Sequence, residues 1–168
     1  MAKPEVSIVM GSDSDLDIMM EAVKSLSDFG IPHEVQMLSA HRSPERVTKF
    51  GKGLRKRGIQ VVIAGAGGAA HLAGVIAAHT TIPVIGVPID SSALKGLDSL
   101  LSTVQMPSGI PVATVAIGKS GAANAGILAV QILSLHSKPL QAKLVKHKEK
   151  LSRSVVEKNN RLKKSKAR

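Results

Sequence analysis

The chain has 168 residues, of which 43% are hydrophobic and 21% charged, and this composition fits one globular domain with a sizeable core. It contains no cysteine, which excludes disulfides and thiolate metal sites and fits a reducing compartment. The first residues carry no signal-peptide pattern, and no apolar run is long enough to span a bilayer. We therefore expect a cytoplasmic protein with no membrane partner.

The net charge of +11 is concentrated near the C-terminus. Residues 138–168 hold twelve lysines and arginines against two glutamates, whereas residues 1–137 are almost neutral. Such a segment is either a patch that binds nucleic acid or a membrane surface, or a solvated helix that frays at its end. The segment has no aromatic residue for base stacking, so we expect no nucleic-acid partner. We assign residues 1–137 to an α/β domain and residues 138–168 to a basic C-terminal helix and tail.

Short apolar runs alternate with segments of helical periodicity through the first 137 residues. Gly30 is placed to end one helix and Pro44 to begin the next. The expected strands cover residues 6–10, 33–38, 60–64, 83–87 and 112–116. The expected helices cover residues 14–29, 44–57, 69–79, 93–102, 120–135 and 138–158. Five β-α units with short connections predict a three-layer α/β/α sandwich with a five-stranded parallel sheet, flavodoxin-like or Rossmann-like, plus a C-terminal helix.

The segment over residues 122–133 is apolar nearly all round. A helix in the outer layer of such a domain normally has a polar face. Residues 69–79 are similarly small and apolar. We therefore expect another copy of the chain to bury the outer side of these helices, the alternative being alanine-rich helices whose exposure is tolerated.

The first unusual loop is Gly-Ser-Asp-Ser-Asp at residues 11–15, directly after the first expected strand. The carboxyl edge of a parallel sheet is where ligands bind in open α/β folds. Gly11 allows a tight turn, Ser12 and Asp15 can cap the following helix, and the first amides of that helix can hold an anion. Simple helix capping is the alternative interpretation.

The second loop is Ser-Ala-His-Arg-Ser-Pro at residues 39–44, after the second expected strand. His41 can take or give a proton near neutral pH. Arg42 can bind a phosphate with two parallel hydrogen bonds, and Ser39 and Ser43 add hydroxyl donors. The alternative is a surface histidine in a polar turn, which the neighbouring arginine and serines make less attractive.

The third loop, over residues 64–71, contains Gly-x-Gly but neither the full dinucleotide fingerprint nor the lysine of a phosphate-binding P-loop. NAD and ATP are therefore not expected as cofactors. Because this loop consists of glycine and alanine before His71, its backbone amides can approach a ligand closely. His71 is expected to support the site. No histidine pair with a carboxylate has metal-ligand spacing, so no metal is expected. The three loops predict a site that binds a small phosphorylated anion and transfers protons through His41.

At these loops the chain resembles the N5-carboxyaminoimidazole ribonucleotide mutases, the class I form of the purine-biosynthetic carboxylase. The resemblance covers residues 5–135 in register, and the tail from residue 138 lies outside it. Asp13 stands where lysine is common, and Ala73 where proline is expected. The matching segments are residues 11–15, 39–44, 64–74, 83–88, 104–107 and 116–125.

This resemblance implies an isomerase that moves CO2 from the exocyclic nitrogen of N5-carboxyaminoimidazole ribonucleotide to ring carbon C4, without ATP, biotin or metal. It implies that His41 is the acid and base and that Asp15 holds the ribose hydroxyls. It further implies a homo-octamer in which residues 105–107 complete the pocket of a neighbouring subunit. The implied phosphate ligands are Ser12, Ser39 and Arg42, the CO2 cradle is Gly67 and Gly68, and the remaining substrate-binding residues are Ala40, Ala66 and His71.

Three other functions remain open at this point. A class II enzyme would join free CO2 to aminoimidazole ribonucleotide directly, but residues 72–88 and 105–107 are more similar to class I. A non-catalytic flavodoxin-like nucleotide sensor would need the phosphate-binding loops but not His41. A nucleic-acid-binding protein would depend on the basic tail.

Overall fold

The computed structural model describes residues 3–90 and 93–166. Within them, all strand pairs are parallel and form one five-stranded sheet in the order β2-β1-β3-β4-β5. This arrangement confirms the predicted sheet. The strands are β1 (Val6–Met10), β2 (His33–Met37), β3 (Val61–Gly67), β4 (Val84–Ile89) and β5 (Ala113–Thr114).

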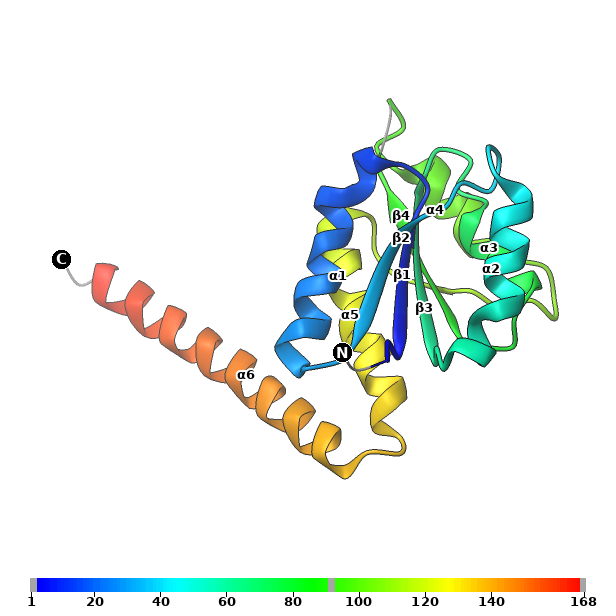
Figure 1. The fold of residues 1–168 in the computed structure, drawn as a ribbon. Coiled ribbons are helices and arrows are strands. Elements are labelled where there is room, and N and C mark those ends of the chain that lie inside the picture. The colour runs from blue at the N-terminus through cyan, green and yellow to red at the C-terminus, as the bar shows by residue number, and fades with distance from the viewer. Residues whose placement is uncertain (1–2, 91–92, 167–168) are drawn as a thin grey trace. The chain divides into compact units, whose positions relative to one another are not determined.

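Helices cover both faces of this sheet, which confirms the three-layer fold (Figure 1). Helices α1 and α5 lie on one face, and α2 and α3 lie on the other. A Cβ atom at Gly86 would meet Thr103 of α4 and Ala73 of α3, so α4 shares the face of α3. The helices are the short 3-10 turn η1 (Asp13–Asp15), α1 (Leu16–Phe29), α2 (Pro44–Arg57), α3 (Leu72–Ala78), α4 (Leu97–Val104), α5 (Gly118–Ser134) and α6 (Lys138–Lys166).

Several boundaries differ from the predicted ones. Strand β3 continues to Gly67, beyond the predicted residue 64, because its glycine-rich end still pairs with β4. Helix α3 starts at residue 72 rather than 69, because Gly68 and Ala70 have positive φ angles of 60° and 36°. Helix α6 runs to residue 166 rather than 158, since its last turns hold lysine, arginine and leucine without glycine or proline.

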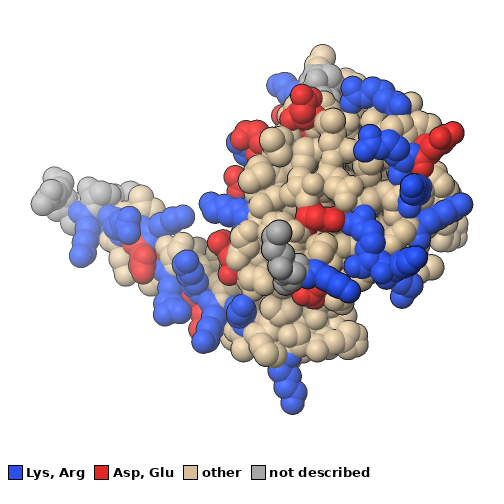
Figure 2. Space-filling model, in the orientation of Figure 1, with Lys and Arg blue, Asp and Glu red and all other residues tan. Residues whose placement is uncertain are grey.

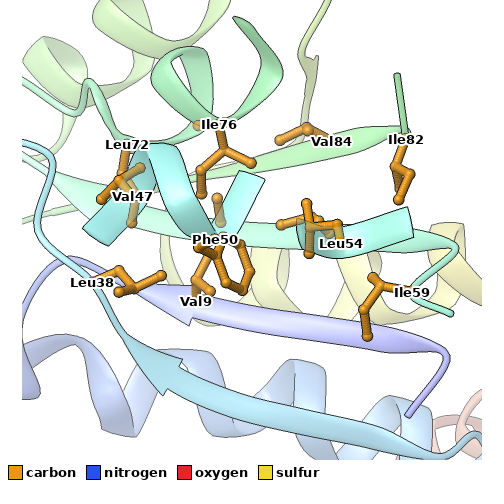
Figure 3. Packing of buried hydrophobic residues seen from close by; sticks show 13 residues of the cluster. Val9, Leu38, Val47, Phe50, Leu54, Ile59, Leu72, Ile76, Ile82 and Val84 are labelled. Carbon is orange, nitrogen blue, oxygen red and sulfur yellow. The ribbon is translucent and has the colours of Figure 1, made fainter. Parts of the chain in front are cut away.

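A buried hydrophobic cluster fixes α2 and α3 on the sheet (Figure 3). Val47, Phe50 and Leu54 of α2 and Ile76 of α3 pack in this cluster with Val9 of β1. Burial of each such side chain stabilises the fold by about 1.5–3 kcal/mol. The loops that lead into α2 and α3 are therefore anchored at both ends, which makes them firm supports for a site.

Helix α5 packs closely against α1 on the opposite face. A Cβ atom at Gly126 would lie 2.6 Å from Cβ of Ser25 and 3.0 Å from the carbonyl oxygen of Ala22, so only glycine permits this approach. The single chain already buries Ala122, Ala125 and other apolar side chains of α5. Much of the apolar character that predicted a subunit contact for this helix is thus explained within one chain.

The chain divides into two compact units, Met1–Ile132 and Leu133–Arg168. The second unit is dominated by the 29-residue helix α6, most of whose described side chains are exposed. Gln141 donates a hydrogen bond to the carbonyl oxygen of Ser134 at 2.8 Å, and Arg153 lies 3.8 Å from Glu149. Across residues 3–90 and 93–166, no helix is both long and apolar enough to cross a membrane.

Candidate active site

A cavity of about 370 Å³ lies where β1, β2 and β3 end. The three loops that the sequence singled out meet there, because the carboxyl ends of parallel strands share one edge of the sheet. All ten residues predicted for the site contribute to its wall. The cavity is lined by Gly11, Ser12, Ser14, Asp15, Ser39, Ala40, His41, Arg42, Ala66, Gly67, Gly68, Ala70, His71 and Leu72.

The first loop forms a reciprocal capping box around η1. The backbone N–H of Ser14 donates to Oγ of Ser12 at 3.4 Å, and the backbone N–H of Ser12 donates to Oδ2 of Asp15 at 3.2 Å. The hydroxyl of Ser14 donates to Oδ1 of Asp15 at 3.3 Å. These bonds hold the carboxylate in place beside the cavity.

Asp15 is only 6% exposed, and this burial raises the pKa of its carboxyl above the ordinary value. Hydrogen bonds from Ser12, Ser14 and Gly11 oppose the rise, and the charge of Asp13 adds to it slightly. A carboxylate in such surroundings gains from further hydrogen-bond donors, and ligand hydroxyl groups can supply them.

In the second loop, Arg42 connects two loops. Its Nη2 donates to the carbonyl oxygen of Gly11 at 2.8 Å, and its Nε lies 3.3 Å from Oγ of Ser39. The backbone N–H of Arg42 also donates to this hydroxyl at 3.2 Å. The guanidinium is thus oriented before any ligand arrives, and it retains further N–H donors for an anion.

His41 and His71 form a hydrogen-bonded pair. Nε2 of His41 lies 2.7 Å from Nδ1 of His71, and the rings meet edge to face with centroids 4.9 Å apart. One nitrogen must carry a proton and the other a lone pair for this bond to form. The contact therefore holds the imidazole of His41 against a second imidazole, which ends the third loop.

The third loop is a compact turn that lines the cavity from residue 66 to residue 68. Gly68 has a φ angle of 60°, and Ala70 is buried with a φ angle of 36°. The N–H of Ala70 donates to the carbonyl oxygen of Gly67 at 3.2 Å. A left-handed alanine costs about 1–2 kcal/mol, and such strain is typical of functional sites. Successive N–H groups in turns of this kind form concave anion-binding surfaces.

The loop over residues 105–107 does not line the cavity of the chain that contains it. A Cβ atom at Gly74 would lie 3.0 Å from Sδ of Met106, so this methionine packs over α3 of its own chain. The expected contribution of this loop to a neighbouring subunit stays a prediction. In the described part of the chain, no three His, Asp or Glu side chains gather as a metal site.

Sequence reasoning gave no site role to four residues of the cavity wall. Gly11 and Ser14 belong to the first motif, so the motif itself could have indicated them. Ala70 and Leu72 are apolar and carried no such signal. The sequence also carried no indication that His41 pairs with His71, since thirty residues separate the two rings.

Known proteins are similar to this chain in sequence and in fold. The chain matches the AIR carboxylase family over residues 5–154, so the family extends into α6, and the expectation that everything from residue 138 lies outside it is wrong. The N5-carboxyaminoimidazole ribonucleotide mutase of Pyrococcus horikoshii is 57% identical over 160 residues, covering 95% of this chain and 89% of that protein. The mutase of Bacillus subtilis is 52% identical over 160 residues, covering 95% and 99%.

The fold comparison agrees with these relatives. A crystal structure of Treponema denticola PurE superimposes with a TM-score of 0.85 at 29% sequence identity, covering 95% of this chain and 98% of that one. A crystal structure of a single-residue variant of the protein from the same organism gives a TM-score of 0.86 at 28% identity, covering 96% and 99%. From the family match and the close relatives together, this chain belongs to the AIR carboxylase family.

Proposed function

We propose that this protein is an N5-carboxyaminoimidazole ribonucleotide mutase of purine biosynthesis. Close relatives carry this name. The observation that carries the proposal is the cavity itself, in which the hydrogen-bonded His41 and His71 face an anion clamp built on Arg42. A proton-transfer group and a phosphate clamp in one cavity are what an isomerisation of a carboxylated ribonucleotide requires.

In this proposal the 5′-phosphate binds to Arg42, Ser39 and Ser12. The guanidinium is already oriented by its bond to Gly11, so less side-chain entropy is lost when an anion binds. Asp15 accepts hydrogen bonds from the ribose hydroxyls. Its buried, capped position fixes the distance between the sugar and the phosphate.

His41 then transfers two protons in turn. The bond between the exocyclic nitrogen and the carboxylate carbon breaks, its electrons return to nitrogen, and His41 gives that nitrogen a proton. CO2 and an electron-rich aminoimidazole result. Ring carbon C4 attacks CO2, and the proton displaced from C4 returns to His41, so the reaction consumes no net proton. His71 orients the imidazole of His41 through their 2.7 Å contact.

The backbone of Gly67 and Gly68 receives the carboxylate and the transient CO2. CO2 has no charge to bind strongly, so a closed, dry pocket must retain it. The open side of Gly68, where a Cβ atom would have no neighbour within 4 Å, leaves room beside the backbone amides. Those amides stabilise the carboxylate at both ends of its transfer.

We propose further that the protein acts as a cytoplasmic homo-octamer in which residues 105–107 complete a neighbouring pocket. The support is the outer face of α4, where Leu97, Leu101 and Val104 are 52%, 47% and 50% exposed. Large exposed apolar side chains gathered on one helix are typical of interaction sites. Light scattering on the purified protein would measure the mass of the assembly, and a monomer would contradict this part.

The test is a turnover assay with two substrates and one variant. We expect conversion of N5-carboxyaminoimidazole ribonucleotide, and a loss of about 10²–10⁴-fold in kcat for His41→Asn with substrate binding retained. Turnover only of aminoimidazole ribonucleotide with bicarbonate would instead assign the class II reaction. Full activity in the variant would rule out His41 as the proton shuttle.

A further inference from the structure

A second cavity, of about 420 Å³, lies at the opposite edge of the sheet. It is formed by the C-terminal half of α2 and by residues 78–81, which precede β4. The candidate active site follows β1, β2 and β3, so the two cavities are on different edges of the sheet and share no residue. The second cavity is lined by Gly51, Lys52, Arg55, Ala78, His79, Thr80 and Thr81.

The lining of this cavity carries cations and hydroxyl groups but no carboxylate. Lysines and arginines gather over α2 in Figure 2. Within residues 3–90 and 93–166, neither Lys52 nor Arg55 takes part in an ion pair. Nη2 of Arg55 donates to Oγ1 of Thr81 at 2.7 Å, which holds the guanidinium against the loop.

The histidine in this cavity is held in place by its surroundings. A Cβ atom at Gly51 would lie only 2.8 Å from Cβ of His79, so the absence of a side chain on α2 makes room for the half-buried histidine. Nε2 of His79 lies 3.2 Å from Oγ1 of Thr48. Oγ1 of Thr80 accepts a hydrogen bond from the backbone N–H of Ile82 at 3.2 Å, which orders the loop.

From these contacts we propose that the cavity binds a small soluble phosphate-bearing molecule, independently of the candidate active site. The guanidinium of Arg55 supplies parallel donors, Lys52 a second full charge, and Thr81 and His79 polar partners. The C-terminal ends of α2 and α3 both place negative partial charge at this edge, up to about half a charge each. The two full cations of Lys52 and Arg55 outweigh it. Because helix C-termini expose carbonyl groups and not amides, the site depends on side chains.

Equilibrium dialysis of radiolabelled pyrophosphate against the full chain, at about 0.15 M salt to screen diffuse attraction, tests the proposal. We expect two bound anions per chain. The double variant Lys52→Gln/Arg55→Gln should lose one of them, with its affinity reduced at least about tenfold. The matched double variant Lys49→Gln/Lys56→Gln removes the same charge from exposed positions of α2 that do not line the cavity, and it should keep both.

Two further variants separate the possible failures. Gly51→Ala leaves the charge unchanged but displaces His79. It should therefore weaken binding of the anion that Lys52→Gln/Arg55→Gln loses, and thermal unfolding confirms that the variant folds. Arg42→Gln should remove only the other anion, and its failure to do so would count against the proposed substrate site alone. Pyrophosphate binding that is indifferent to the Lys52→Gln/Arg55→Gln change, or equally sensitive to the Lys49→Gln/Lys56→Gln change, would overturn the second site.

Discussion

The two edges of the sheet use the same residue types in different settings. At the carboxyl edge, His41 and Arg42 lie among serines, and at the amino edge His79 and Arg55 lie among threonines. His41 contacts another imidazole, whereas His79 contacts a hydroxyl. The first histidine therefore has a neighbour that can exchange protons, and the second has one that only orients it.

The backbone also differs between the edges. Loops at the carboxyl edge lead into helix N-termini, whose first amides have no partner within the helix. The amino edge receives the C-terminal ends of α2 and α3, whose carbonyl groups repel anions. One edge can thus stabilise developing negative charge during a reaction, and the other can only bind an anion through side chains. Whether a histidine and an arginine can support a reaction therefore depends on the helix ends around them more than on the two residue types.

Among variants that leave His41 in place, the largest expected difference between the edges concerns their arginines. If Arg42 binds the substrate phosphate as we propose, Arg42→Gln removes charge-assisted bonds to it, so kcat/KM should fall about 10- to 100-fold, mainly through KM. Arg55→Gln serves as the matched control and should leave kcat/KM unchanged. Steady-state kinetics on the two variants measures this contrast, and equal losses would mean that the phosphate is not bound where we place it.

A smaller effect is expected at His71, the hydrogen-bond partner of His41, and none at His79. His71→Asn removes the ring that orients His41, so kcat should fall about two- to tenfold and its pH profile should change shape, while KM stays near the wild-type value. His79→Asn should alter neither quantity. If His71→Asn lowered kcat without changing the pH profile, His71 would only pack against His41 and would not orient it for proton transfer.

The smallest effect concerns Asp15 and the pH dependence of stability. Because burial raises the pKa of Asp15 in the folded state, the folded protein holds this proton more tightly than the unfolded chain does. The free energy of unfolding therefore declines as the pH rises from the ordinary aspartate pKa to the raised value. Asp15→Asn should remove this decline and be more stable than wild type above that range, by less than about 1 kcal/mol, because hydrogen bonds from Ser12 and Ser14 offset part of the burial.

Urea unfolding at several pH values measures the Asp15 effect. Asp28→Asn, at an exposed position of α1, is the control and should show the wild-type slope. If the free energy of unfolding fell more steeply with rising pH in Asp15→Asn than in wild type over this range, the sign that we assign to burial would be wrong.

Local sequence patterns were sufficient to predict the three layers of the fold and the three loops that line the candidate site. Apolar runs bounded by glycine and proline placed the five strands and the main helices, because periodicity reports directly which side of an element is buried. The predicted end of β3 failed because its backbone conformation is set by pairing with a strand distant in sequence. The glycine-rich composition predicts a loop from residue 64, although the glycines that end β3 still pair with β4.

The sequence by itself determined which residue types stand at each strand end, and hence which residues line the candidate site. Only the tertiary structure decided which of them meet. The hydrogen bond between His41 and His71 and the bond from Arg42 to Gly11 each join loops about thirty residues apart. The amino-edge cavity likewise arises only when α2 packs against the end of α3, with Gly51 against His79. Contacts of this kind depend on how whole elements pack, and no local pattern encodes them.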